Sequence, residues 1–149
     1  MLDPQAQALL DLMAARGVPP THTLTPDQAR AFYRDRRSVT QPAPPEVAQV
    51  LDLDAPGPLG VIPLRLYRGL GAPAVAPVLV YFHGGGWVMG DLETHDTLCR
   101  SLANEAGCVV VAVDYRMGPE HRFPAAVDDC LAATRWLPGQ ATALGLDAQ

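Results

Sequence analysis

One segment of the chain is best placed to do chemistry. It consists of a histidine, three glycines and a tryptophan, and it directly follows an apolar run. The motif is His83-Gly84-Gly85-Gly86-Trp87, and the run before it is Pro77 to Phe82. Without Cβ atoms, the glycines leave backbone N–H groups that a ligand can approach closely. Such groups can be aimed at an oxygen that gains negative charge during a reaction, which is an oxyanion hole. A flexible glycine turn is the alternative, but the strand before the motif and its flanking residues favour a site.

Two continuous apolar segments, residues 78–82 and 109–113, must position this motif. Runs of this kind are typical of strands buried on both faces of a mainly parallel sheet. Between them the pattern predicts a helix over 96–106 that ends at Gly107. Its inward-facing residues are expected to be Leu98 and Leu102.

A further helix is expected from Pro124 to the Pro138-Gly139 pair. Its predicted core stripe is Val127, Cys130, Leu131, Thr134 and Leu137. Strand, helix, strand, helix in this order predicts an α/β fold.

The first forty residues predict two short amphipathic helices, over about Asp3–Arg16 and Pro26–Arg37. The second begins with a capping-box pattern at Thr25 and Gln28. Helices this short need a surface to lie on. The first one's apolar stripe is Leu2, Ala6, Leu9, Leu10 and Met13.

After a proline-rich linker over 41–45, two strands are expected at Val47–Leu53 and Ile62–Leu66. A turn over residues 55–58 joins them. Because Pro63 has no N–H to donate, the pair is expected at the edge of the sheet.

Composition limits the function. The 149 residues suit one domain, and a net charge of −5 offers no basic surface for nucleic acid. No apolar stretch is long enough for a membrane span and no secretory signal is visible, so the expected location is cytoplasmic. Three cysteines without metal-ligand spacing and four scattered histidines predict no metal and no cofactor. Cys99, Cys108 and Cys130 are expected to pack as small apolar residues.

Two longer blocks closely resemble the hallmark motifs of the hormone-sensitive-lipase-like esterases, the bacterial class IV carboxylesterases. The first runs from His83 to Asp96, and the second is Asp114-Tyr115-Arg116-Met117-Gly118-Pro119-Glu120-His121-Arg122-Phe123-Pro124-Ala125-Ala126. Met117-Gly118 departs from the commoner Leu-Ala. The resemblance implies an α/β-hydrolase fold, a mostly parallel sheet with flanking helices. Residues 1–40 would form part of a helical cap, and residues 41–149 the N-terminal half of the catalytic domain.

The resemblance also implies roles for single residues. The backbone N–H groups of Gly85 and Gly86 would be the oxyanion donors. Trp87 would line the substrate pocket or pack in the core, and Phe32 and Tyr33 would face substrate or simply pack. The residues expected to support the site are His83, Gly84 and Asp91.

Two polar clusters invite a catalytic interpretation, but structural roles are favoured. Asp91, Glu93 and His95 are expected to brace the loop or cap a helix, because neighbouring chain positions rarely form a triad. The other cluster is expected to be one buried polar network after the second apolar run: Asp114, Arg116, Glu120 and His121.

A catalytic nucleophile is missing from the sequence. In this fold it stands in a G-x-S-x-G elbow, followed by the acid and the histidine. The two serines, Ser38 and Ser101, lie outside such a motif, and Gln149 comes before the place where the elbow is expected. The chain alone is therefore expected to be inactive and to require the C-terminal half of the fold.

Two functions remain open from the sequence. The first is a serine carboxylesterase acting on small esters with short to medium acyl chains, without nucleic acid or membrane insertion and with a homodimer left open. The second is a non-catalytic, receptor-like protein of the same fold that binds a small molecule. Fold alone does not separate them.

Overall fold

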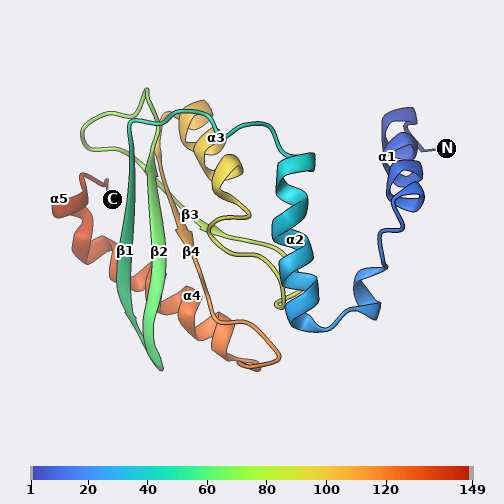
Figure 1. Cartoon of the computed structure of the whole chain (residues 1–149). Coiled ribbons are helices and arrows are strands. Elements are labelled where there is room, and N and C mark those ends of the chain that lie inside the picture. The colour runs from blue at the N-terminus through green and yellow to red at the C-terminus, as the bar shows by residue number, and fades with distance from the viewer. Residues whose placement is uncertain (1, 148–149) are drawn as a thin grey trace.

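The computed structural model describes residues 2–147 and, in helix α2, the side chains up to Arg37. Its four-stranded sheet has the order β1-β2-β4-β3, with helices on both faces (Figure 1). The strands are β1 (Gln49–Gly57), β2 (Gly60–Arg68), β3 (Val78–Phe82) and β4 (Val109–Val113). The helices are α1 (Pro4–Ala15), α2 (Pro26–Thr40), α3 (Asp96–Ala106), α4 (Ala125–Trp136) and α5 (Ala141–Leu144), with 3₁₀ turns η1 (Thr21–Thr23) and η2 (Leu137–Gln140).

Strand β4 is the centre of the fold. All five of its residues are buried, and it pairs in parallel with β3 and antiparallel with β2. Alternate side chains point to opposite faces, so Val109 and Val111 join the core under α4 whereas Val110 and Ala112 join the core under α3. The prediction of a strand buried on both faces is confirmed for β4.

Strand β3, in contrast, is not buried on both faces within this chain. Leu79 and Phe82 are 37% and 41% exposed, and the other three residues of the strand are only partly buried. Within the described residues β3 pairs with β4 alone. One edge of β3 and part of each face therefore stay open.

The β1–β2 hairpin differs from its prediction in two ways. The expected turn over residues 55–58 is wrong, because β1 continues to Gly57 and the turn is Pro58–Leu59. The hairpin lies at one edge of the sheet as predicted, but Pro63 stands in β2, the inner strand of the pair, which also pairs with β4. Pro63 is accommodated because β4 has ended opposite it, and its carbonyl accepts the Asp114 N–H at 2.9 Å.

Helix α3 has the bounds that the sequence predicts, and Gly107 ends it with a left-handed φ of 57°. Its predicted inner face is partly wrong. Leu98 is 43% exposed, whereas Cys99 and Ala103 are fully buried. Leu102 packs against the same core as expected. The small side chains bring the helix close to the sheet.

The predicted inner face of helix α4 is also partly wrong. Its buried residues are Ala125, Asp129 and Ala133, and Leu137 directly after it is buried as predicted. Cys130 is partly buried and packs against the same core, but the prediction is wrong for Val127 and Leu131, which are 52% and 45% exposed, and for Thr134, which is also exposed. An apolar face of α4 is therefore open beside β3.

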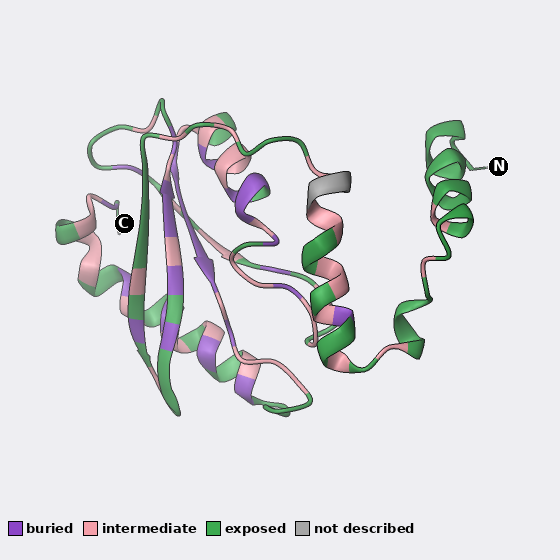
Figure 2. Cartoon of the chain, in the orientation of Figure 1, coloured by how far each residue is buried: buried purple, intermediate pink, exposed green. Residues whose placement is uncertain are grey.

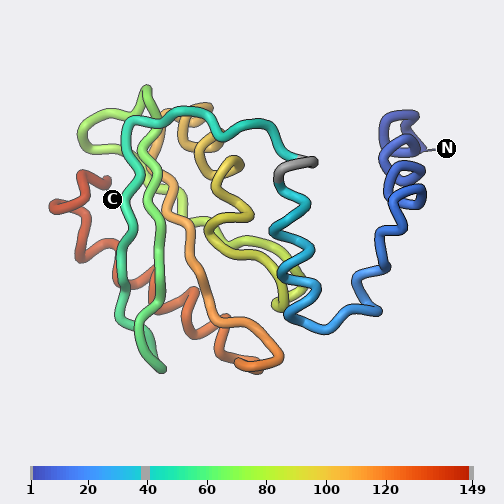
Figure 3. Tube along the Cα trace, in the orientation of Figure 1, coloured from blue at the N-terminus to red at the C-terminus, as the bar shows by residue number. Residues whose placement is uncertain are grey.

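The N-terminal helices begin where the sequence predicts. The Asp3 side chain caps α1, and Thr25 and Gln28 form a reciprocal capping box on α2. Helix α2 continues to Thr40, past the expected end at Arg37. From there the chain crosses one end of the sheet to reach β1 (Figure 3).

Helix α1 is set apart from the sheet, and none of its residues is buried (Figures 1 and 2). Its apolar side chains meet α2 instead, where Leu9, Leu12 and Met13 line a small groove with Phe32. Helix α2 lies beside the loops that follow β3 and β4 and is tied to them by ion pairs.

Candidate active site

The glycine loop, residues 83–89, leaves the carboxyl end of β3 and turns back on itself. The N–H groups of Val88 and Met89 both donate to the Gly85 carbonyl, at 3.2 and 3.0 Å. Gly85 and Gly86 have φ angles of 135° and 64°. A Cβ on Gly85 would stand 1.9 Å from the Met89 carbonyl oxygen, so this position accepts only glycine.

The two expected oxyanion donors lie beside a pocket. Within residues 2–147, the N–H groups of Gly85 and Gly86 donate no hydrogen bond. Both glycines line an open pocket of about 570 Å³, at the end of the strand where α/β sheets place their ligands. The rest of the lining is mainly apolar: Phe82, His83, Gly84, Trp87, Tyr115, Ala126, Val127, Cys130, Leu131 and Thr134.

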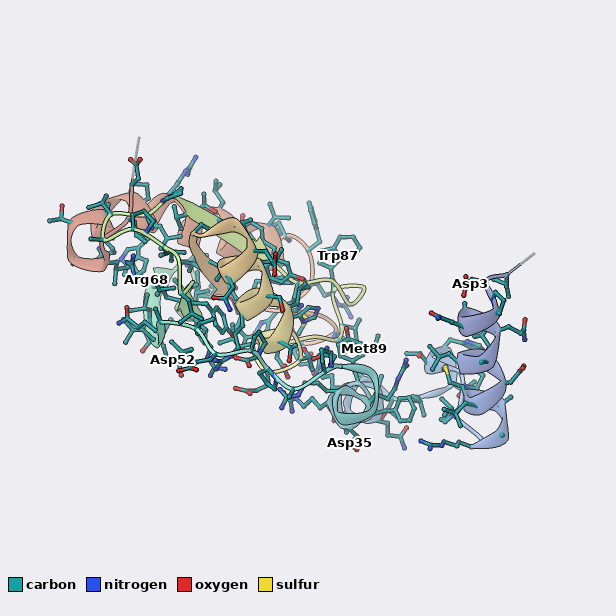
Figure 4. All side chains as sticks on the ribbon, turned by 90° about the horizontal axis from the view of Figure 1, so that it is seen from above. Asp3, Asp35, Asp52, Arg68, Trp87 and Met89 are labelled. Carbon is teal, nitrogen blue, oxygen red and sulfur yellow. The ribbon has the colours of Figure 1, made fainter. Side chains whose placement is uncertain are left out.

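Trp87 projects at this pocket rather than into the core. Its side chain is 68% exposed, and with a φ of 57° it is the sole non-glycine residue at positive φ in the described part of the chain. Such a conformation costs about 1–3 kcal/mol and is found most often at functional sites. In Figure 4, Met89 lies next to α2 and Trp87 lies on the far side of the same loop.

His83 is buried behind the loop, only 5% exposed. Its carbonyl accepts a hydrogen bond from the Tyr115 hydroxyl, and its ring stacks between Tyr115 and His95. Its Nδ1 lies 3.0 Å from the Gly84 carbonyl oxygen. These contacts suit support of the loop better than proton transfer in the pocket.

Asp91 also supports the loop. Its carboxylate accepts the Thr94 N–H at 2.7 Å, the Thr94 hydroxyl accepts the Asp91 N–H at 2.9 Å, and Arg34 pairs with the carboxylate. Burial raises the pKa of Asp91, but these partners outweigh it and hold the pKa below its ordinary value. Asp91 is therefore an anion that fixes the loop to α2.

Glu93 and His95 do not join Asp91 in a triad. Glu93 pairs with Arg37 and Arg65. The His95 ring lies among Tyr33, Tyr81 and His83, and burial lowers its pKa. His95 stands at the start of α3 without capping it through its side chain.

The polar cluster after β4 is not the single network that the sequence suggested. Arg116 pairs with Asp129 of α4, whose carboxylate accepts the Arg116 N–H at 3.0 Å and its Nε–H at 2.7 Å. Glu120 pairs instead with Arg30 of α2. Burial raises the pKa of Asp114. Two separate ion pairs therefore hold this loop, one to each neighbouring helix.

Sequence reasoning missed Asp129 and Arg30. A signal for Asp129 was present, because an acid four residues from Ala125 and from Ala133 shares their face of the helix. For the contacts of Arg30 with the loops there was none, since Val88, Gly118 and Glu120 lie 58 to 90 residues away.

The structure does not bring Phe32 and Tyr33 to the pocket of the glycine loop. Phe32 lies in the groove between α1 and α2, with the Arg36 guanidinium 5.7 Å from its ring centre. The Tyr33 ring lies 6.2 Å from that of His95. Neither lines the pocket that Gly85 and Gly86 form.

Residues 2–147 hold no group of histidine, cysteine or acidic side chains arranged for a metal ion. Over the same residues, no helix has the length and apolar character needed to cross a bilayer.

Known proteins resemble this chain closely. A family described as the α/β hydrolase fold matches residues 79–149. An ethyl acetate hydrolase of Pseudomonas putida is 44% identical over 99% of this chain and 49% of its own length. Esterase LipI of Mycobacterium tuberculosis is 51% identical over 72% of this chain and 34% of its own length.

Solved structures agree with these relatives. The ester-hydrolase EH1AB1 from the metagenome of Lake Arreo superposes with a TM-score of 0.91 at 44% identity, over 99% of this chain and 48% of that one. The α/β-hydrolase fold and the resemblance to hormone-sensitive-lipase-like esterases are thus confirmed. The chain spans about half the length of the Pseudomonas putida enzyme and of the Lake Arreo ester-hydrolase.

Proposed function

Since this chain belongs to the α/β-hydrolase fold family, we propose that it forms the N-terminal half of a carboxylic ester hydrolase. The observation that carries the proposal is the pair of N–H groups on Gly85 and Gly86. Both are without a hydrogen-bond acceptor within residues 2–147, and both residues line the pocket at the end of β3.

In this proposal the two N–H groups stabilise the ester carbonyl oxygen as a nucleophile adds to the carbonyl carbon. One preorganised donor can contribute ~3 kcal/mol at that step. Trp87 forms one wall for the substrate, and the apolar lining suits esters with short to medium acyl chains. His83, Gly84 and Asp91 keep the loop in shape.

The nucleophile, acid and base would come from residues outside this chain. Ser101 supports this view, because its hydroxyl donates to the Thr97 carbonyl within α3 at 3.0 Å and does not line the pocket. The side chain of Ser38 lies outside the described residues. An elbow that carries the nucleophile also supplies a further oxyanion donor, so it must lie next to the glycine loop.

The open side of the sheet supports the same arrangement. β3 has a free edge, and the exposed side chains of Phe82, Val127 and Leu131 surround the pocket beside it. A parallel strand added at that edge would end next to Gly85 and Gly86. Apolar surface of this kind is a typical site of association.

The test compares two proteins. One is residues 1–149 alone. The other, the hybrid esterase, is the same residues followed by the part of the Lake Arreo ester-hydrolase that this chain does not cover. We expect p-nitrophenyl acetate turnover only in the second, abolished by a serine-directed organophosphate and by replacement of its elbow serine with alanine.

Two outcomes would contradict the proposal. One is saturable, organophosphate-sensitive turnover by residues 1–149 alone. The other is a hybrid that folds cooperatively and binds an ester analogue without hydrolysing it, which would favour the receptor-like function. If the fusion itself does not fold, the two halves are co-expressed as separate polypeptides and assayed in the same way.

A further inference from the structure

We propose that Arg30 of α2 is a positioning residue that aligns and polarises the Gly86 N–H group through two intervening peptide groups. The proposal rests on the proposed function, because it assigns Arg30 a role in the oxyanion hole. It concerns a side chain 56 residues before Gly86, on a helix that does not line the pocket.

Arg30 joins three segments of the chain. Its Nε donates to the Val88 carbonyl at 2.8 Å, and one Nη donates to the Gly118 carbonyl at 2.8 Å. Both Nη atoms donate to the Glu120 carboxylate, at 2.8 and 2.7 Å. The side chain is 23% exposed. A guanidinium held by a bidentate carboxylate has a fixed orientation, so Glu120 aims the Nε–H at the glycine loop.

From Val88 the hydrogen bonds lead back to the proposed hole. The Val88 carbonyl shares a peptide group with the Met89 N–H, which donates to the Gly85 carbonyl at 3.0 Å. The Gly85 carbonyl in turn shares a peptide group with the Gly86 N–H. Arg30, the 88–89 peptide and the 85–86 peptide therefore form one directed series that ends on the donor facing the pocket.

All dipoles in this series point the same way. Each peptide accepts at its oxygen and donates from its nitrogen, and a cation stands at the start. Hydrogen bonds in such a chain strengthen one another, by roughly 10–30% per bond. The Gly86 N–H is thereby both fixed in direction and made a stronger donor for a developing oxyanion.

A second contact stabilises the same turn. The Gly118 N–H donates to the Trp87 carbonyl at 2.8 Å, and the Gly118 carbonyl is itself bound by Arg30. Trp87 has the unfavourable φ of 57°. Arg30 therefore supports Trp87 in two ways. It binds the carbonyl of the next residue, Val88, and it binds Gly118, whose N–H donates to the Trp87 carbonyl.

The test has two readouts. In residues 1–149, amide hydrogen exchange measured by NMR reports the Met89 N–H, the middle bond of the series. In the hybrid esterase, kcat and KM are measured with p-nitrophenyl acetate, together with inhibition by a phosphonate analogue of the transition state. The variants are Arg30→Gln, Arg30→Lys and Glu120→Gln, and the matched control is Arg36→Gln, on α2 beside Phe32.

For Arg30→Gln we expect Met89 exchange to be about tenfold faster and kcat to fall about 10- to 100-fold, with KM changed less than about twofold. Phosphonate affinity should fall with kcat. Arg30→Lys, which keeps the charge without the bidentate pair, should recover part of kcat. Glu120→Gln should resemble Arg30→Lys, and Arg36→Gln should resemble the wild type.

Met89 exchange that is unchanged in Arg30→Gln overturns the proposal, whatever the activity. Faster exchange with unchanged kcat in an active hybrid also overturns it, because the Gly86 donor would then be independent of Arg30. A wild-type hybrid that folds without turnover overturns the proposed function instead, and the exchange data still decide whether Arg30 orders the loop. Fractions folded are measured by urea titration, so that a loss of stability is not read as a loss of kcat.

Discussion

The Tyr115 ring stacks on the His83 imidazole with 4.5 Å between ring centres, and its hydroxyl donates to the His83 carbonyl. His83 directly follows β3, and Tyr115 is the second residue after β4, the strand that pairs with β3 in parallel. Tyr115 is 6% exposed and His83 5%. One aromatic residue thus fixes the point at which the glycine loop leaves the sheet.

Tyr115→Phe tests this contact, because it keeps the ring and removes the hydroxyl. The buried His83 carbonyl loses its donor, so we expect a loss of about 1–3 kcal/mol in the free energy of unfolding, measured by urea titration. Tyr81→Phe is the control, since the Tyr81 hydroxyl donates no hydrogen bond within residues 2–147. Equal effects of the two substitutions would show that the hydroxyl of Tyr115 is not what matters.

Alanine substitutions along the glycine loop should lower kcat to different degrees, least at Gly84 and most at Gly85. A Cβ on Gly84 meets nothing within 4 Å, and Gly84 has an ordinary φ, so kcat of the hybrid should stay within about threefold of wild type. Gly86 has space but a φ of 64°, which costs alanine about 1–2 kcal/mol. Gly85→Ala forces the Cβ against the Met89 carbonyl, and kcat should fall about a hundredfold or more. A Gly84 variant as impaired as the Gly85 variant would contradict this geometry.

Asp129→Asn should destabilise the fold in a pH-dependent way. Asp129 is fully buried, and the Arg116 hydrogen bonds outweigh the effect of burial and hold its pKa below 3.8, its ordinary value. A lowered folded pKa means that the stabilisation is fully present above 3.8 and is lost as the pH falls through the folded value. We expect a loss of about 3 kcal/mol at pH 7 that shrinks steadily below pH 4.

Urea titrations of wild type and Asp129→Asn from pH 7 down to pH 3 measure this difference. Asp128→Asn is the control, because that neighbouring side chain is exposed. A difference between wild type and Asp129→Asn that stays constant over the whole range would mean that the charge of Asp129 is not responsible.

Cys130 should be the first cysteine to react with a small alkylating reagent. It is partly exposed and lines the pocket, whereas Cys99 and Cys108 are buried. Burial raises the pKa of Cys130 to about 11 and that of Cys99 to about 12. Because the thiolate is the reactive form, alkylation of Cys130 should be slow at pH 7 and accelerate about tenfold per pH unit up to pH 10.

Mass spectrometry after limited alkylation identifies the modified residue. Cys130→Ser provides the control, in which the fast phase should disappear. A rate that levels off below pH 9 would contradict the raised pKa. In the hybrid esterase, slower alkylation of Cys130 would show that the added half covers the pocket.

Local sequence signals determined much of the scaffold. The Thr25–Gln28 capping box, Gly107 at the end of α3 and the apolar runs of β3 and β4 act within a few residues, and each stands where it was predicted. The glycine loop is equally local, because positive φ at Gly85 and Gly86 depends on the absence of a Cβ.

Predictions of which face of a helix packs against the sheet were less reliable. Leu98, Val127 and Leu131 are apolar and correctly spaced, yet alanine and cysteine neighbours face the sheet in their place. Periodicity shows that a helix has an apolar stripe. It does not show which of two overlapping stripes packs more closely.

The sequence by itself therefore determined the fold class, most of the elements and the glycines of the candidate hole. Only the tertiary structure decided that Asp129 pairs with Arg116 and that Arg30 lies against the Val88 carbonyl. The physical reason is distance along the chain. Capping, turns and periodicity are set by neighbours within a few residues, whereas an ion pair or strand edge depends on which remote segments the completed fold brings together.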